Sequence, residues 1–247
     1  MVNILIIGET CIDRFQYCKV SKICPEAPVP VVTPLYEVSN LGMAGNTFAN
    51  IKALMPGEII ATLNNKNEIT KTRYVEEKSN HMFLRVDEGE DKIEPFKWSL
   101  SKDAMLGMAD ITIVSDYNKG FLTDNDIMEI GRKSNLSIID SKRNLTNKLV
   151  KDYNFVKLNE SERTNNPLLN LDNIITTLGE YGAKYQNISY PSPNPQQTID
   201  VSGAGDTFTS SFITKYYQTR DVKTSIEFAN RMAAQVVSKK GVVTPEV

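Results

Sequence analysis

Apolar runs of strand length alternate with segments of helical spacing along most of this chain. Residues 2–8 form an apolar run typical of a strand that is buried on both faces. Residues 44–54 have helical spacing and are followed at once by Met55 and the stop signal Pro56-Gly57. Because strands that alternate with helices form parallel sheets covered on both faces, the pattern predicts an α/β fold.

The same alternation continues to the end of the chain. We expect further strands at residues 111–115, 136–140, 155–158 and 174–177, and helices at 124–132, 205–217 and 224–239. Four polar residues stand at or just after the ends of these strands: Asp116, Asp140, Asn159 and Thr177. Because ligands bind at the carboxyl edge of parallel sheets, these side chains are candidates for a binding site.

Two regions depart from the pattern. Residues 15–38 are rich in Pro, Val and Tyr and have an extended character, and residues 70–75 and 82–87 also read as strands. Together they predict a small antiparallel sheet that stands off the core as a lid or a dimer surface. The alternative is that these segments are edge strands of the main sheet.

Composition excludes several classes of protein. The 28 basic and 30 acidic residues are mixed along the chain, which gives no footprint for nucleic acid, and no apolar run is long enough to span a membrane. Cys11, Cys18 and Cys24 are unevenly spaced and odd in number, so we expect free thiols in the cytoplasm. The N-terminus lacks the basic region of a signal peptide. With His81 as the only histidine, the sequence disfavours a Ser–His–Asp triad or a multi-histidine zinc site.

The most informative motif is residues 200–208, which read Asp-Val-Ser-Gly-Ala-Gly-Asp-Thr-Phe immediately before an apolar helical segment. Small residues allow a tight turn, and the N–H groups at a helix N-terminus favour an anion. Asp206 would repel phosphate if the loop only bound it, so it is a candidate general base for phosphoryl transfer. An ordinary acid at a helix start explains it equally well.

These motifs give the chain a resemblance to the ribokinase-like (pfkB-type) carbohydrate kinases from end to end. Residues 200–206 are similar to that family's C-terminal Asp-Thr-x-Gly-Ala-Gly-Asp signature. Residues 41–46, Leu-Gly-Met-Ala-Gly-Asn, resemble its N-terminal glycine motif, and residues 159–162 its Asn-x-x-Glu motif. The resemblance implies a ribokinase-like fold, with a mostly parallel central sheet flanked by helices and a small β-sheet lid.

Two further stretches resemble the kinases that act on heptose 7-phosphate, a precursor of the lipopolysaccharide core. Residues 8–15 lead into residues 23–32, Ile-Cys-Pro-Glu-Ala-Pro-Val-Pro-Val-Val, and residues 115–120 read Ser-Asp-Tyr-Asn-Lys-Gly. The resemblance implies ATP-dependent phosphoryl transfer with Mg²⁺, and it also admits a monovalent cation. It implies a small-molecule sugar or sugar phosphate as partner and a homodimer formed through the lid.

The resemblance also assigns roles to particular residues. It implies that Asp206 is the base and that the loop amides of Gly203, Ala204 and Gly205 stabilise the transferred group. Asn159 and Glu162 would position Mg²⁺ through water, although a helix N-cap with a capping-box acid gives the same pattern. The implied sugar-binding residues are Asp13, Gly42, Gly45, Asn46, Arg85 and Asp116. The implied nucleotide-binding residues are Lys142, Asn159, Thr177, Gly179, Gly182 and Asn230.

The chain departs from the family pattern in several places. Met43 stands where the family has a second glycine, Glu9 where the subfamily has Asp, and Cys24 where it has Ser. The segment between Leu54 and Lys71 is short, so we expect the sheet to have lost an edge unit there. We expect no adenylyltransferase segment after Val247, and we expect residues 1–247 to form one kinase domain with lid segments at about 15–38 and 70–87.

Three functions remain open from the sequence. The first is a kinase of heptose 7-phosphate or a similar sugar phosphate. The second is a pfkB-type kinase of an unphosphorylated sugar or a nucleoside. The third is a degraded kinase that binds a ligand or partner without turnover. Asp206 and the Gly-Ala-Gly loop argue against the third function, whereas Met43 and the short segment after Leu54 argue for it.

Overall fold

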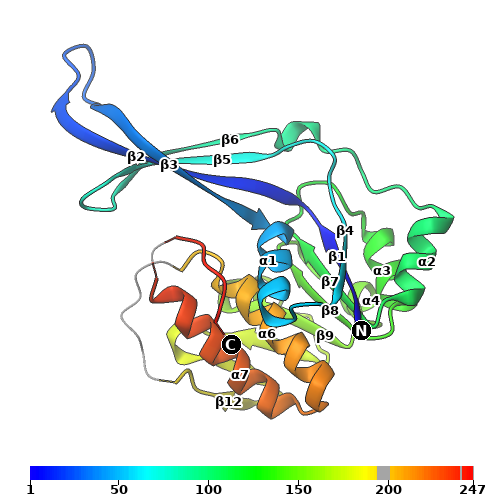
Figure 1. Ribbon diagram of the computed structural model, residues 1–247. Coiled ribbons are helices and arrows are strands. Elements are labelled where there is room, and N and C mark those ends of the chain that lie inside the picture. The colour runs from blue at the N-terminus through cyan, green and yellow to red at the C-terminus, as the bar shows by residue number, and fades with distance from the viewer. Residues whose placement is uncertain (194–200, 240, 247) are drawn as a thin grey trace.

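A computed structural model describes residues 1–193, 201–239 and 241–246, and its larger sheet lies between two layers of helices (Figure 1). Within these residues the sheet has eight strands in the order β12-β11-β10-β9-β8-β7-β1-β4. In this order, the strands from β10 across to β4 pair with their neighbours in parallel. Strand β11 pairs antiparallel with both β10 and β12. The strands are β1 (Asn3–Gly8), β4 (Ile59–Leu63), β7 (Ile111–Asp116), β8 (Ser137–Ser141), β9 (Phe155–Asn159), β10 (Ile174–Thr177), β11 (Ala183–Tyr185) and β12 (Ile188–Tyr190).

Strand β1 shows why helices cover both faces of this sheet. Ile4 and Ile6 pack against one group of helices and Leu5 and Ile7 against the other, because successive side chains of a strand point to opposite faces. The first group is α1 (Ala44–Leu54), α6 (Ala204–Thr219) and α7 (Val222–Val237). The second is α2 (Leu100–Met108), α3 (Asp124–Lys133) and α4 (Asn147–Val150). Shorter helical turns are η1 (Glu90–Lys92), α5 (Glu160–Asn165) and η2 (Gly179–Tyr181).

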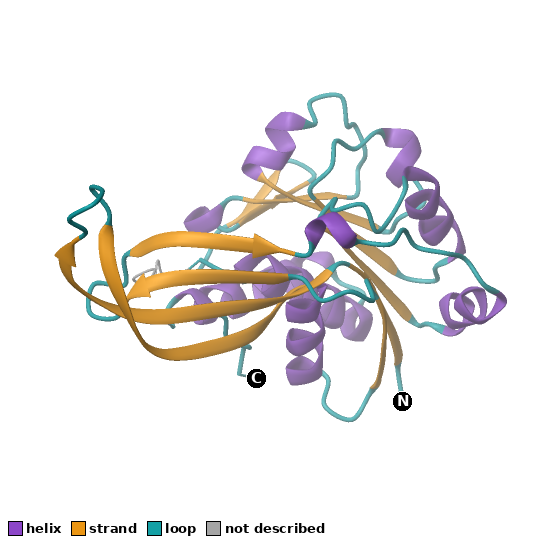
Figure 2. Cartoon of the chain, turned by 90° about the horizontal axis from the view of Figure 1, so that it is seen from above, coloured by secondary structure: helices purple, strands orange, loops and turns teal. Residues whose placement is uncertain are grey.

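The second sheet projects from one side of the larger one, as both ribbon views show (Figures 1 and 2). Its strands run in the order β3-β2-β5-β6. They are β2 (Thr10–Ile23), β3 (Pro30–Met43), β5 (Thr70–Glu76) and β6 (Met82–Glu88). The prediction of a separate small sheet is confirmed, and the alternative of edge strands is wrong. The predicted antiparallel pairing holds for both outer pairs but not for β2 and β5, which are parallel. We call this sheet the lid.

The segment after α1 corrects one expectation. The short stretch between Leu54 and Lys71 suggested a lost edge unit, yet β4 is present there and pairs with β1 at the edge of the larger sheet. Within the described residues the chain passes from β4 directly into β5 without a helix. This segment therefore still supplies an edge strand to the larger sheet.

Two further expectations can be compared with the described residues. No helix among them combines the length and apolarity needed to cross a bilayer. Asp200, the first residue of the Gly-Ala-Gly motif, lies outside the described residues, whereas Val201 to Thr207 lie inside them.

Candidate active site

A cavity of about 620 Å³ lies at the carboxyl ends of β8, β9 and β10, next to the start of α6. We call it the nucleotide cavity. The family resemblance had suggested six nucleotide-binding residues, and all six line it: Lys142, Asn159, Thr177, Gly179, Gly182 and Asn230. The topology accounts for this gathering, because the carboxyl ends of parallel strands meet at one edge of a sheet.

A second cavity of about 450 Å³ lies between the lid and the larger sheet, and we call it the acceptor cavity. Four of the suggested sugar-binding residues line it: Asp13, Gly42, Asn46 and Arg85. Gly45 does not line it; a side chain on Gly45 would meet Leu41, so this glycine allows close packing at the start of α1. The basic residues of the lining are Lys71, Arg73, Arg85, Lys119 and Lys142.

Asp206 and Gly203 line both cavities, together with Tyr117 and Lys142. The two cavities therefore meet at the first turn of α6. Gly203 precedes this helix with φ at 80°, and a side chain there would lie 2.6 Å from the amide nitrogen of Asn46. Only glycine combines that backbone conformation with this close approach. The first-turn N–H groups of α6 thus open onto the junction, where an anion is favoured.

The surroundings of Asp206 suit a general base. Its carboxylate accepts a hydrogen bond from Asn46 Nδ2 at 2.8 Å and from the Tyr117 hydroxyl at 3.2 Å. Burial, together with the negative charge of the nearby Asp140 carboxylate, raises the pKa of Asp206 to about 6, although Asn46, Lys157 and Tyr117 oppose the shift. A carboxyl group that exchanges its proton near neutral pH can accept one from a sugar hydroxyl.

Two neighbours hold the groups around Asp206 in place. Asn50 donates to the Asn46 side chain at 3.1 Å and itself accepts from Thr207 Oγ1 at 2.9 Å. On the other side, the fully buried Glu9 accepts hydrogen bonds from the backbone N–H groups of residues 117, 119 and 121. The longer side chain at position 9 therefore fixes the loop that carries Tyr117.

On the acceptor side, Gly42 makes room for Asp13. A side chain on Gly42 would lie 2.2 Å from Asp13 Oδ2, so the Asp13 carboxylate would have to move away. Asp13 Oδ1 accepts a hydrogen bond from Arg73 of β5, so a lid residue orients this carboxylate. Among the described residues no partner donates to the second oxygen of Asp13, which could accept a hydrogen bond from a polyol hydroxyl.

Asp116 does not have the predicted place at the sugar. It is fully buried and lines neither cavity. Arg143 pairs with it through two nitrogen atoms, at 2.7 Å and 3.1 Å, and Ser141 also donates to it. The charge of Asp116 is therefore neutralised inside the protein by Arg143. The hydrogen bonds of Asp116 link the ends of β7 and β8.

Asn159 and Glu162 form the capping box that the sequence allowed as an alternative. Asn159 Oδ1 accepts from the Glu162 N–H at 2.8 Å, and Glu162 Oε2 accepts from the Asn159 N–H at 2.7 Å. Lys142 occupies the other oxygen of Glu162. Asn159 lines the nucleotide cavity, but Glu162 does not. The capping role of this pair is therefore filled, and Glu162 has no uncommitted oxygen atom.

Asp140 offers a better fit for a hydrated cation. The described residues contain no group of three or more His, Cys, Asp or Glu side chains arranged around a metal site. However, Asp140 lines the nucleotide cavity, and its buried Oδ1 has no hydrogen-bond partner. Lys157 and Lys142 hold the pKa of Asp140 below its usual value in spite of burial, so it is ionised. Because Mg²⁺ keeps several waters and needs only one or two carboxylates beside phosphate oxygens, Asp140 is a candidate for holding it at this cavity.

The residues at the two cavities that sequence reasoning missed include Lys71, Arg73, Tyr117 and Lys157. Arg73 and Lys71 lie in a lid strand and read as ordinary surface charges. Tyr117 stands in the Ser-Asp-Tyr segment, but nothing local marks it as a neighbour of Asp206, 89 residues away. A signal did exist for Lys157, because a lysine interrupts the otherwise apolar run of residues 155–158.

Comparisons with known proteins agree with this geometry. Residues 153–247 match the pfkB family carbohydrate kinases. The bifunctional protein HldE of Aliarcobacter butzleri is 29% identical over 297 aligned positions, covering 98% of this chain but only 62% of that protein. Among solved structures, Arabidopsis thaliana ribokinase complexed with ribose and ATP has a TM-score of 0.73 at 15% identity, over 100% of this chain and 96% of that one. Escherichia coli phosphofructokinase-2 in complex with potassium has a TM-score of 0.71 at 15% identity, with the same coverage. The prediction of a ribokinase-like α/β fold is confirmed.

Proposed function

We propose that this chain is a pfkB-type carbohydrate kinase that transfers the γ-phosphoryl group of ATP to a hydroxyl of a sugar phosphate, with heptose 7-phosphate as the preferred acceptor. The observation that carries the proposal is the position of Asp206 at the junction of the two cavities, with its pKa raised to about 6. Phosphoryl transfer from a nucleotide in one cavity to an acceptor in the other requires a base between them whose pKa lies near neutral pH.

The reaction follows from the groups at the junction. The acceptor hydroxyl lies in the acceptor cavity and attacks the γ-phosphorus while Asp206 takes its proton. The bond between that phosphorus and the oxygen bridging to ADP breaks. N–H groups of the first turn of α6 stabilise the charge on the transferred group, and they are held in place before the reaction begins. Tyr117 and Asn46 keep the carboxylate of Asp206 aimed at the acceptor.

The charge of the acceptor cavity supports a phosphorylated acceptor. Five basic residues line it, against two acidic ones, Asp13 and Asp206. Asp87 and Glu90, which pair with Lys71, Arg85 and Lys119, lie outside the lining. An anionic group on the substrate would meet cations in the part of the cavity nearest the lid. The likeness to the protein named HldE and the subfamily motifs favour heptose 7-phosphate among such substrates.

We assign ATP to the nucleotide cavity and Mg²⁺ to its Asp140 side. Mg²⁺ would neutralise charge on the phosphates, and Asp140 Oδ1 would hold one of its waters or bind it directly. A monovalent cation near the site stays part of the proposal. The full described chain would act as one kinase domain whose lid closes over the acceptor cavity. A cytoplasmic location, where ATP is available, is consistent with this assignment.

The proposal is tested by measuring Mg²⁺-dependent ATP consumption against a panel of acceptors. The panel contains heptose 7-phosphate, other sugar phosphates, the matching unphosphorylated sugars, and nucleosides. We expect the highest kcat/KM with heptose 7-phosphate and a loss when the acceptor lacks its phosphate. A preference for an unphosphorylated sugar or a nucleoside would replace the acceptor in this proposal. ATP binding without turnover on any acceptor would identify a protein that has lost catalysis.

A further inference from the structure

Strand β9 carries a lysine in a place where lysines are rarely found. Lys157 has an exposed fraction of only 2%, and its neighbours Val156 and Leu158 are fully buried. Its ammonium group donates a hydrogen bond to Asp140 Oδ2 at 2.8 Å. Burying a charged group is costly unless it is paired, so Asp140 explains how the fold tolerates Lys157. It does not explain why the cation is there.

The position of the ammonium group suggests a reason. An atom added as a side chain to Gly205 would lie 3.0 Å from Lys157 Nζ, so the nitrogen lies directly against the first turn of α6. Lys157 also lines the nucleotide cavity beside Gly203, Ala204, Gly205 and Asp206. An ammonium group has three N–H donors, and within the described residues only Asp140 accepts from it. Two N–H donors of Lys157 are therefore left beside the backbone N–H groups at the first turn of α6, where an anion is favoured.

We propose that Lys157 is a catalytic residue that donates hydrogen bonds to the γ-phosphoryl group of the nucleotide as it is transferred at the first turn of α6. This inference rests on the proposed kinase function. The backbone amides supply only partial charges, whereas Lys157 brings a full positive charge inside the protein, where water screens it little. Asp140 is the positioning residue that orients the ammonium group from behind.

A second lysine, Lys142, also lines the nucleotide cavity, but its charge is already paired and is exposed to water. Lys142 is paired with Glu162 and lies near Asp140 Oδ1, at 3.7 Å, and its side chain is 36% exposed. Its charge is shared between two acids and is open to water. Lys157 is the more deeply buried of the two and faces Gly205. No proton leaves Lys157 in the proposed step, because Asp206 takes the hydroxyl proton and the electron pair of the broken P–O bond stays with ADP.

The test compares nucleotides with and without the γ-phosphoryl group in Lys157→Met, which keeps the length of the side chain and removes its charge. Binding of ADP and of the imido analogue of ATP is measured calorimetrically in EDTA, so that metal at Asp140 does not enter. We expect a roughly tenfold to hundredfold loss of affinity for the imido analogue, with ADP affected much less. Lys148→Met, on the exposed face of α4, is the matched control and should change neither affinity.

A charge-balanced double variant separates contact from simple neutralisation. Lys157→Met leaves the buried Asp140 charge uncompensated, and Lys157→Met with Asp140→Asn removes both charges. If Lys157 touches the γ-phosphoryl group, the double variant stays as weak for the imido analogue as Lys157→Met. Recovery of wild-type affinity in the double variant, or equal losses for ADP and the analogue, would overturn the proposal. The binding measurement needs no acceptor, so its result does not depend on which sugar is phosphorylated. It can therefore be interpreted even if no acceptor in the panel is phosphorylated.

Discussion

At the scale of single residues, the site depends on how burial and neighbouring charges tune a few acids. Asp206 and Asp140 are both buried carboxylates, yet their pKa values move in opposite directions. Two lysines stabilise the ionised form of Asp140, whereas among the described residues Asp206 forms no ion pair, and the negative charge of Asp140 raises its pKa. The environment thus divides the roles: Asp140 stays ionised, and Asp206 can exchange a proton near neutral pH.

The first prediction concerns the pH dependence of the rate. Asp206 accepts a proton only when it is ionised, and its pKa is raised to about 6. We therefore expect kcat/KM to rise as the pH increases through about 6 and to level off above it. Asp206→Asn should lower kcat by roughly 10²- to 10⁴-fold and leave nucleotide affinity nearly unchanged. A rate that is independent of pH between 5 and 8, or a variant with full kcat, would show that another group is the base.

The second prediction concerns the metal. Asp140→Asn removes the carboxylate that we assign to Mg²⁺, so the Mg²⁺ concentration for half-maximal rate should rise. Glu162→Gln should change this concentration less, because both oxygen atoms of Glu162 are already bound to Asn159 and Lys142. It should instead lower the free energy of unfolding by about 1 kcal/mol through the weakened capping box. A larger Mg²⁺ effect in Glu162→Gln than in Asp140→Asn would reverse the assignment.

At the scale of elements, local sequence patterns predicted most of the fold. The helix at residues 44–54 has the predicted bounds, and the separate lid sheet follows from two pairs of extended segments. The segment at β4 was missed because five residues at a sheet edge, none of them fully buried, give a weak pattern. The parallel pairing of β2 and β5 was missed because it joins segments about sixty residues apart. Such pairings are set by the packed structure and leave no local signal.

The misplacement of Asp116 has the same origin and leads to the third prediction. Its partner Arg143 lies 27 residues away in the chain. The sequence therefore showed an acid at the end of a strand but not the cation that forms an ion pair with it. Breaking a buried ion pair costs about 3–5 kcal/mol. Asp116→Ala should therefore lower the free energy of unfolding by about 3 kcal/mol, measured by urea denaturation, and leave the KM for the acceptor unchanged.

Asp124→Ala is a matched control for this substitution. Asp124 pairs with the same Arg143 at 2.7 Å, but its side chain is 72% exposed. Exposed ion pairs contribute little, so we expect a loss below about 1 kcal/mol. If Asp116→Ala left stability intact and raised the KM for the acceptor, the sugar-binding role suggested by the sequence would be restored.

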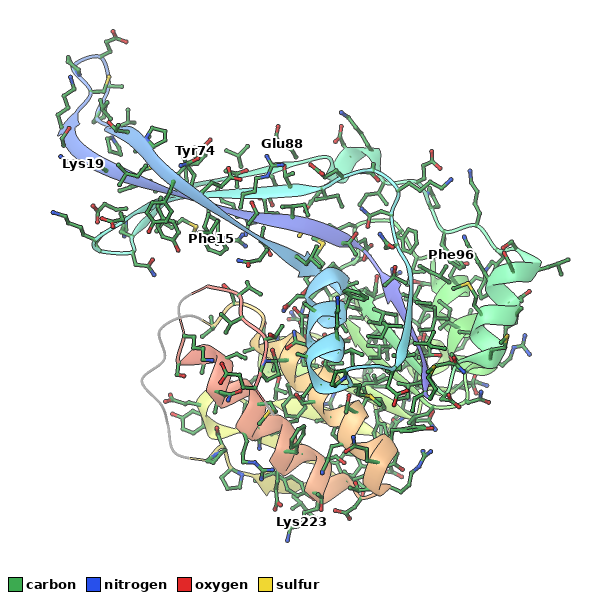
Figure 3. The ribbon with its side chains drawn as sticks, in the orientation of Figure 1. Phe15, Lys19, Tyr74, Glu88, Phe96 and Lys223 are labelled. Atoms are coloured by element: carbon green, nitrogen blue, oxygen red, sulfur yellow. The ribbon has the colours of Figure 1, made fainter. Side chains whose placement is uncertain are left out.

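At the scale of the whole molecule, the lid is a single sheet whose outer part projects away from the helices that cover the larger sheet (Figure 1). Phe15 and Tyr74 lie on its two opposite faces, as their labelled side chains show and the pairing of Phe15 with Arg73 requires (Figure 3). Many large apolar side chains of the lid are exposed: Ile23, Val29, Leu35, Tyr36, Val38, Leu41, Met82 and Leu84. Apolar surface of this kind on a sheet promotes association unless another surface covers it.

The fourth prediction is that two copies of the chain associate through their lids in a symmetric dimer, which would cover this surface and close the contact. Sedimentation at micromolar concentration should give the mass of a dimer. Val38→Lys places a charge on the face of Phe15, and Leu84→Lys places one on the face of Tyr74, so the variant that yields monomers identifies the buried face. A wild-type chain that stays monomeric throughout this range would contradict the dimer. Kinase activity would then still be expected, because the proposal for it rests on Asp206 and its position at the junction of the two cavities.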